Sequence, residues 1–106
     1  MGKRRTSKPA AAPRTLHGAV VADELDLHGY ALEAAERRLE AFFETHAVRT
    51  PGGVVRVITG KGTGSGGRPV LLEAVREALN GWLAHHVSEW AVDMGGGAYL
   101  VRLRRR

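Results

Sequence analysis

The chain has 106 residues and a formal net charge of +5, and this length allows one domain with a modest hydrophobic core. It contains no cysteine, which excludes a disulfide framework, a thiolate zinc site and a cysteine nucleophile, and which fits a reducing compartment. No stretch is apolar enough to span a membrane and no apolar segment follows the basic N-terminus, so we expect a cytoplasmic protein without membrane contact.

The excess positive charge lies at the two ends of the chain. Residues 1–22 contain five basic and no acidic side chains, whereas the other 84 residues contain eleven of each. The last five residues include four arginines. We predict a flexible basic tail over residues 1–22 and a folded domain over residues 23–106. Basic ends suit a polyanionic partner such as nucleic acid, and the alternative is that they only keep the chain soluble.

The domain alternates strands and helices. Alternating polar and apolar residues and β-branched runs predict strands, and apolar residues that recur on one face predict helices. In chain order, the predicted elements are a strand over 24–28, a helix over 31–45, a strand over 54–58, a helix over 69–84 and strands over 87–92 and 99–103.

This β-α-β-α-β-β order predicts an α/β fold. Right-handed crossovers place both helices on one face of a four-stranded mixed sheet, which gives a two-layer sandwich with the other face open. Side chains alternate along a strand, so Leu25 and Leu27 face the helices while Asp26 and His28 share the opposite face. Arg56 faces outward from the second strand for the same reason.

Asp26 and His28 stand near the C-terminal end of the first strand, which is where open α/β sheets place ligands. An aspartate can orient a histidine, hold a metal ion, or act with the histidine as an acid–base pair. The alternative is an inert surface pair. The spacing alone does not decide between these interpretations.

A glycine-rich loop, TGKGTGSGGRPV at residues 59–70, leaves the second strand and enters the second helix. Free backbone N–H groups and the helix N-terminus form a phosphate site there, and Lys61 adds a mobile positive charge. The alternative is a flexible loop without a ligand. Residues 62–67 also fit the G-x-G-x-x-G dinucleotide pattern, with Asp93 as a ribose-binding acid. However, the chain lacks a second nucleotide-binding half, so an NAD-type enzyme is the distant alternative.

The two motifs together, LDLHG at residues 25–29 and TGKG at residues 59–62, each followed by a helix, resemble the Smr (small MutS-related) domain over residues 23–104. Short stand-alone bacterial members with a basic N-terminal segment look most similar. The resemblance implies a fold like the C-terminal domain of a bacterial translation initiation factor, with the four strands in the order first, second, fourth, third. It also implies an endonuclease that nicks DNA or cleaves RNA, including messenger RNA on stalled ribosomes.

The resemblance also implies which residues act. A nucleic-acid phosphate would approach the glycines beside the aspartate and histidine, at the C-terminal ends of two adjacent strands. The catalytic residues it implies are Asp26, His28 and Lys61. The second motif places Thr59, Gly60 and Gly62 at the phosphate. The residues themselves add Gly64 and Arg68 of the same loop as phosphate-binding candidates, and Lys3, Arg4, Arg5 and Arg56 as further nucleic-acid-binding candidates.

We expect a monomer that binds DNA or RNA, with association with the ribosome as one form of this, and no organic cofactor. RNA cleavage through a 2′-hydroxyl needs no metal ion, whereas DNA nicking favours Mg²⁺ or Mn²⁺ held by Asp26. Leu72 stands where the family often has a basic residue, and Arg68 or Arg76 are the candidates to supply that charge. This departure favours the alternative function, a nucleic-acid-binding module without catalysis.

Overall fold

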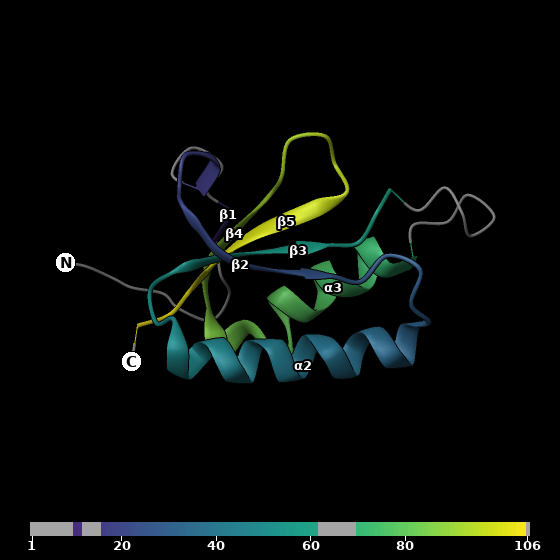
Figure 1. The fold of residues 1–106 in the computed structure, drawn as a ribbon, viewed down its shortest axis with the longest axis horizontal. Coiled ribbons are helices and arrows are strands. Elements are labelled where there is room, and N and C mark those ends of the chain that lie inside the picture. The colour runs from purple at the N-terminus through teal and green to yellow at the C-terminus, as the bar shows by residue number, and fades with distance from the viewer. Residues whose placement is uncertain (1–9, 12–15, 62–69, 106) are drawn as a thin grey trace.

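The computed structural model describes residues 10–11, 16–61 and 70–105. Two helices cover one face of a sheet, as Figure 1 shows. None of the helices in these ranges is long and apolar enough to cross a lipid bilayer. In chain order, the elements are β1 (Ala10–Ala11), β2 (Val21–Asp26), α2 (Leu32–Arg49), β3 (Val54–Ile58), α3 (Val70–Asn80), the 3₁₀ helix η1 (Ala84–His86), β4 (Val87–Val92) and β5 (Ala98–Leu103).

The sheet is mixed, and its strand order is β1-β4-β5-β3-β2. Strands β2 and β3 run parallel, with Leu25 opposite Val57, and β5 runs antiparallel to both β3 and β4. The α/β class and the order of the four predicted strands are therefore confirmed. The short strand β1 pairs with β4 in parallel and adds a fifth strand that the sequence pattern did not predict.

The main core lies between the two helices and the sheet. Leu39 and Phe43 of α2, Leu79 of α3 and Val57 of β3 are at most 1% exposed. Leu27 is fully buried in the same cluster and Leu25 packs against it, which confirms the inward face that was predicted for the first strand. Burial of these apolar side chains is the main term that holds the helices on the sheet.

The opposite face of the sheet is partly covered, although it was expected to be open. Leu16 is fully buried there against Val54, Ala91 and Leu100, with Ala19 and Val21 packed beside them. Residues 1–22 were predicted to be a flexible tail, but in the structure β1 pairs with β4 and Leu16 packs on the sheet. A single leucine in a segment rich in alanine, proline and basic residues gives no periodic signal, so the sequence pattern missed it.

The last turn of α2 is attached to the sheet by a buried histidine. His46 is 8% exposed, and its Nε2 lies 3.0 Å from Oδ2 of Asp23 in β2. Its Nδ1 lies 2.7 Å from the hydroxyl of Thr50, the residue that ends the helix. Helix α2 continues past residue 45, the predicted end, because these contacts satisfy His46 inside the fold.

Candidate functional site

A tight turn follows β2 and carries His28. The N–H of Tyr30 donates to the carbonyl of Leu27 at 3.1 Å, and Gly29 has φ +84°. A positive φ at the third position is the requirement of a type II turn, and glycine meets it without strain. The N–H of Leu27 also donates to the carbonyl of Ile58 at 2.7 Å. The turn is thereby fixed against the end of β3.

Asp26 and His28 form a hydrogen-bonded pair. Oδ1 of Asp26 lies 2.7 Å from Nδ1 of His28 and accepts from the His28 backbone N–H at 3.1 Å. The hydrogen bond from the His28 side chain, followed by that from its backbone, holds the pKa of Asp26 below its usual value of 3.8. Asp26 is therefore a carboxylate at neutral pH and can only accept, so Nδ1 is the donor and Nε2 lies outside this hydrogen bond.

Both side chains of the pair are accessible. His28 is 71% exposed and Asp26 is 51% exposed. The two hydrogen bonds to Asp26 use Oδ1, which leaves Oδ2 outside them. Mg²⁺ is usually bound through one or two carboxylates together with phosphate oxygens, and Asp26 fits that requirement. Within the described residues, no group of three or more histidine, aspartate or glutamate side chains could hold a metal ion.

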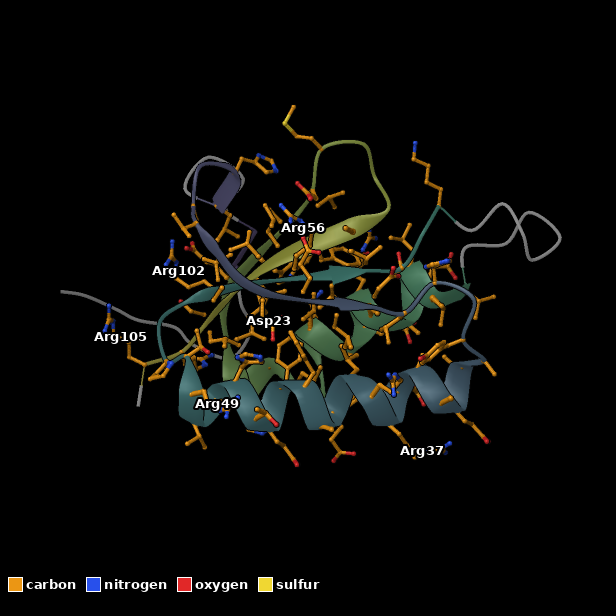
Figure 2. The ribbon with its side chains drawn as sticks, viewed as in Figure 1. Asp23, Arg37, Arg49, Arg56, Arg102 and Arg105 are labelled. Carbon is orange, nitrogen blue, oxygen red and sulfur yellow. The ribbon has the colours of Figure 1, made fainter. Side chains whose placement is uncertain are left out.

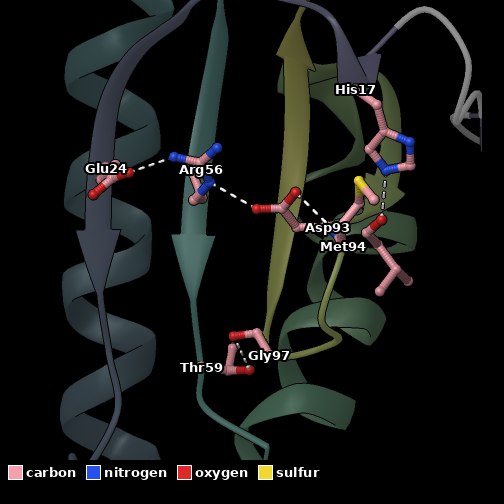
Figure 3. Close-up of polar contacts among 8 residues, drawn as sticks. His17, Glu24, Arg56, Thr59, Asp93, Met94 and Gly97 are labelled. Carbon is pink, nitrogen blue, oxygen red and sulfur yellow. Dashed lines mark hydrogen bonds and ion pairs between the residues drawn. The ribbon is translucent and has the colours of Figure 1, made fainter.

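The first residues of the glycine loop leave β3 in a defined conformation. Thr59 is 5% exposed, Gly60 has φ +80° and the side chain of Lys61 is exposed. The N–H groups of Thr59 and Gly60 donate to the carbonyl of Gly97 at 2.9 and 3.0 Å. The Thr59 hydroxyl donates to the carbonyl of Gly60 at 2.9 Å and lies 3.3 Å from that of Gly97, which Figure 3 shows beside it.

The two sequence motifs lie side by side. A Cβ atom built on Gly60 would stand 3.5 Å from Cβ of His28, which is van der Waals contact. The structure therefore brings Asp26 and His28 beside Gly60, with Lys61 next along the chain. Of the other implied site residues, Gly62, Gly64, Arg68, Lys3, Arg4 and Arg5 lie outside the described ranges.

Arg56 lies on the outer face as predicted, but it is held by two carboxylates. Its Nε donates to Asp93 at 2.8 Å and its Nη1 donates to Glu24, as Figure 3 shows. Arg56 is 28% exposed, and the bond to Glu24, then that to Asp93, raises its pKa. Its charge is thus matched inside the fold, which leaves little attraction for a phosphate. Asp93, the candidate ribose-binding acid, is a partner in this network.

The C-terminal arginines lie away from the Asp26–His28 pair. Side-chain atoms of Arg105 come within 3.0 to 3.2 Å of a Cβ built on Gly52, which precedes β3, whereas Thr59 follows the other end of that strand. Figure 2 shows Arg49, Arg102 and Arg105 gathered at the end of the domain where β3 begins. Arg102 also donates to Glu89 at 2.8 Å. These arginines and the Asp26–His28 pair therefore lie at opposite ends of β3.

Leu72 stands on α3 where the family often has a basic residue, and Arg76 on the same helix is a candidate to supply that charge. No described contact connects either residue with the Asp26–His28 pair. Leu72 packs against the core, and its carbonyl accepts the Tyr99 hydroxyl at 2.9 Å. Burial raises the pKa of Tyr99, and a hydrogen bond with Arg76 partly offsets this. Arg76 is thus located at Tyr99, whose side chain packs in the core between the helices and the sheet.

The LDLHG motif begins in the last residues of β2, and the TGKG motif begins directly after the adjacent parallel strand β3. This arrangement agrees with a family comparison. The Smr domain family matches residues 25–104, which is most of the chain. A comparison with individual curated proteins finds no match. Both motifs and all four predicted strands fall within or at the edge of the matched range. The chain therefore belongs to the Smr domain family.

Proposed function

We propose that this protein is an endonuclease that cleaves a phosphodiester bond of a nucleic acid. The phosphate of that bond would bind at Gly60 and Lys61, beside Asp26 and His28. Membership of the Smr domain family suggests a nucleic-acid-binding or nuclease-type function. The observation that carries the proposal is the contact between His28, oriented by the Asp26 carboxylate, and the positive-φ Gly60 at the start of the loop. An oriented imidazole next to a glycine and an exposed lysine is a set of groups suited to phosphoryl chemistry.

In this mechanism, Nε2 of His28 takes a proton from the nucleophile, which is a water molecule or an RNA 2′-hydroxyl. The nucleophile oxygen attacks the phosphorus, and the leaving oxygen departs with the electron pair of its bond and takes a proton from water. Asp26 stabilises the imidazolium that forms, because it is already a carboxylate bonded to Nδ1. Lys61 stabilises the negative charge that develops on the phosphoryl oxygens. A bound Mg²⁺, held by Asp26, would add charge neutralisation and would activate water.

The phosphate contacts in this proposal come from Lys61 and from Gly62, Gly64 and Arg68. Thr59 and the N–H of Gly60 contribute indirectly, because their hydrogen bonds are used within the fold. Arg56 is paired with two carboxylates, so the long-range attraction for nucleic acid comes from the basic N-terminal segment.

The proposal is tested by cleavage assays on supercoiled plasmid and on single-stranded RNA, each with and without Mg²⁺ or Mn²⁺. We expect product from at least one substrate with the native protein, and a rate of product formation lower by about a hundredfold or more with Asp26→Asn. Tight binding without product under every condition would instead select the binding-module alternative, which the leucine at position 72 favours. A thermal shift with dinucleotides would support the NAD-type alternative.

The basic N-terminal segment is expected to set the salt dependence of binding. Replacing Lys3, Arg4, Arg5 and Lys8 with glutamine removes four cations and leaves strand β1 in place. The slope of log affinity against log salt should flatten by about 3 to 4, and affinity at moderate salt should fall more than about tenfold.

The salt slope and the rate at saturating substrate are measured on the same variants. The control is Arg37→Gln, because Arg37 points away from the sheet in Figure 2 and is one charge only. Its slope should change by no more than about 1. The saturated cleavage rate should survive in both variants. An unchanged slope in the fourfold variant would show that the segment only solubilises the chain.

A further inference from the structure

The β4–β5 turn, which includes residues 93–97, borders the candidate site although it belongs to neither the LDLHG nor the TGKG motif. The carbonyl of Gly97 accepts the N–H groups of both Thr59 and Gly60 and lies 3.3 Å from the Thr59 hydroxyl. A carbonyl oxygen has two lone pairs, so this acceptor is fully used by the first two residues of the loop. The loop therefore starts from a point that a different strand pair fixes.

Gly97 also provides the surface on which Lys61 lies. A Cβ atom at Gly97 would stand 3.3 Å from the carbonyl carbon of Gly60 and 3.4 Å from Cγ of Lys61. Its φ is not in the positive range, so its backbone conformation does not require glycine. What favours glycine there is the close approach of the loop, which would have to shift by a few tenths of an ångström to admit a methyl group.

Asp93 anchors the β4–β5 turn to the sheet. The Asp93 N–H donates to the carbonyl of Ala98 at 2.9 Å, and its carbonyl accepts the N–H of Gly96 at 3.1 Å. Its carboxylate accepts from the Met94 N–H at 2.8 Å and from Arg56 at 2.8 Å. A continuous set of contacts thus runs from Arg56 through the turn to Gly97. The set ends at the residues that carry the lysine.

We infer that the β4–β5 turn is a third part of the catalytic site, and that Gly97 and Thr59 are positioning residues that hold Gly60 and Lys61 against His28. This inference rests on the proposed endonuclease function. It assigns Thr59 to the support of the loop and not to the phosphate, because its N–H and its hydroxyl both donate inside the fold and the residue is 5% exposed. Small displacements of reacting groups have large effects on rate.

The first test is Gly97→Ala against Gly18→Ala, which adds the same methyl group where nothing lies within 4 Å. We expect Gly97→Ala to lower kcat for cleavage about tenfold or more, with KM changed less than about threefold, because the loop shifts by a fraction of an ångström. Gly18→Ala should behave as the native protein. Equal kcat values for the two variants would overturn the inference.

The second test separates positioning from phosphate binding. Thr59→Val removes the hydroxyl and keeps the shape of the side chain, and Thr59→Ser restores the hydroxyl. A positioning role predicts a lower kcat in Thr59→Val, an unchanged KM, and recovery of kcat in Thr59→Ser. A raised KM with unchanged kcat in Thr59→Val would instead assign the hydroxyl to the substrate and would overturn the inference for Thr59.

Amide hydrogen exchange tests the same contacts without nucleic acid. The N–H groups of Thr59 and Gly60 should be protected in the native protein and in Gly18→Ala, and should exchange faster in Gly97→Ala. Unprotected amides in the native protein would overturn the inference, whatever the cleavage assay gives. If the native protein cleaves neither plasmid nor RNA, the proposed function is contradicted, even if these amides are protected. The exchange rates in Gly97→Ala would then be the test of how Gly60 and Lys61 are positioned.

Discussion

Replacing His28 with alanine is expected to lower the rate of cleavage at saturating substrate by about 10²- to 10⁴-fold, the range that a general acid–base group contributes. The free energy of unfolding should change by less than about 0.5 kcal/mol, because exposed side chains contribute little to stability. His28 is 71% exposed, and its polar partner among the described residues is Asp26. The measurement is a single-turnover rate with saturating plasmid or RNA, together with denaturant unfolding.

Asp26→Asn should give a loss of similar order. The amide keeps the size of the carboxylate, but it removes the negative charge that favours the Nδ1–H tautomer and stabilises the imidazolium. The matched control is Asp23→Asn, because Asp23 lies on the same strand and also holds a histidine, His46, but on the helix-covered side. Full activity of the Asp26 and His28 variants would contradict the catalytic assignment, and so would a loss of activity confined to the Asp23 variant.

The Asp23 control has its own pH signature. The N–H of Glu24, followed by His46, holds the pKa of Asp23 below its usual value of 3.8. A depressed pKa in the folded state means that the stabilising contribution is present above the usual value and is lost as the pH falls through the folded-state pKa. The free energy of unfolding of the native protein should therefore lose the contribution of the Asp23 carboxylate as the pH falls below about 3.8, whereas Asp23→Asn should lack that contribution at every pH. The measurement is denaturant unfolding of both proteins over a range of acidic pH values.

The largest effect on stability outside the main core is expected at Leu16. Leu16→Ala should lower the free energy of unfolding by about 2 to 4 kcal/mol, because removal of a fully buried leucine side chain leaves a cavity. Leu16 is 0% exposed and packs on Val54, Ala91 and Leu100. The adjacent His17 donates from Nε2 to the carbonyl of Val92 at 2.8 Å, as Figure 3 shows, and this bond holds the segment across β4.

Two shortened chains locate the same contribution. A chain that begins at Thr15 keeps Leu16 and His17. A chain that begins at Asp23 follows the boundary that the sequence pattern suggested and loses both, together with Ala19 and with Val21 and Ala22 of β2. We expect the second chain to unfold at a clearly lower urea concentration than the first. The matched control is Val20→Ala, since Val20 is 89% exposed and its truncation should change stability by no more than about 0.5 kcal/mol. Equal midpoints for the two shortened chains would contradict the packing of Leu16.

Several features of this protein follow from local sequence because they depend on near neighbours in the chain. The β-branched run from Val54 to Ile58 is a strand with the predicted bounds, because bulky branched side chains suit a pleated, buried surface. Leu25 and Leu27 face the core because side chains alternate along a strand, and the same alternation sends Asp26 to the other side. The order of the four predicted strands was implied by the Smr resemblance and not by local pattern, and the structure has that order.

The contacts that define the site are of another kind. Arg56 is neutralised by Glu24 and Asp93, which are 32 and 37 residues away, and Thr59 is tied to Gly97 across 38 residues. Leu16 is buried by residues of three strands. Such pairs depend on which strands are neighbours and on their register, and spacing within a segment carries no information about register. The sequence by itself therefore determined the two long helices, the four main strands, the direction of their faces and the two motifs. Only the tertiary structure decided which charges are matched, which segment covers the outer face and which turn supports the lysine.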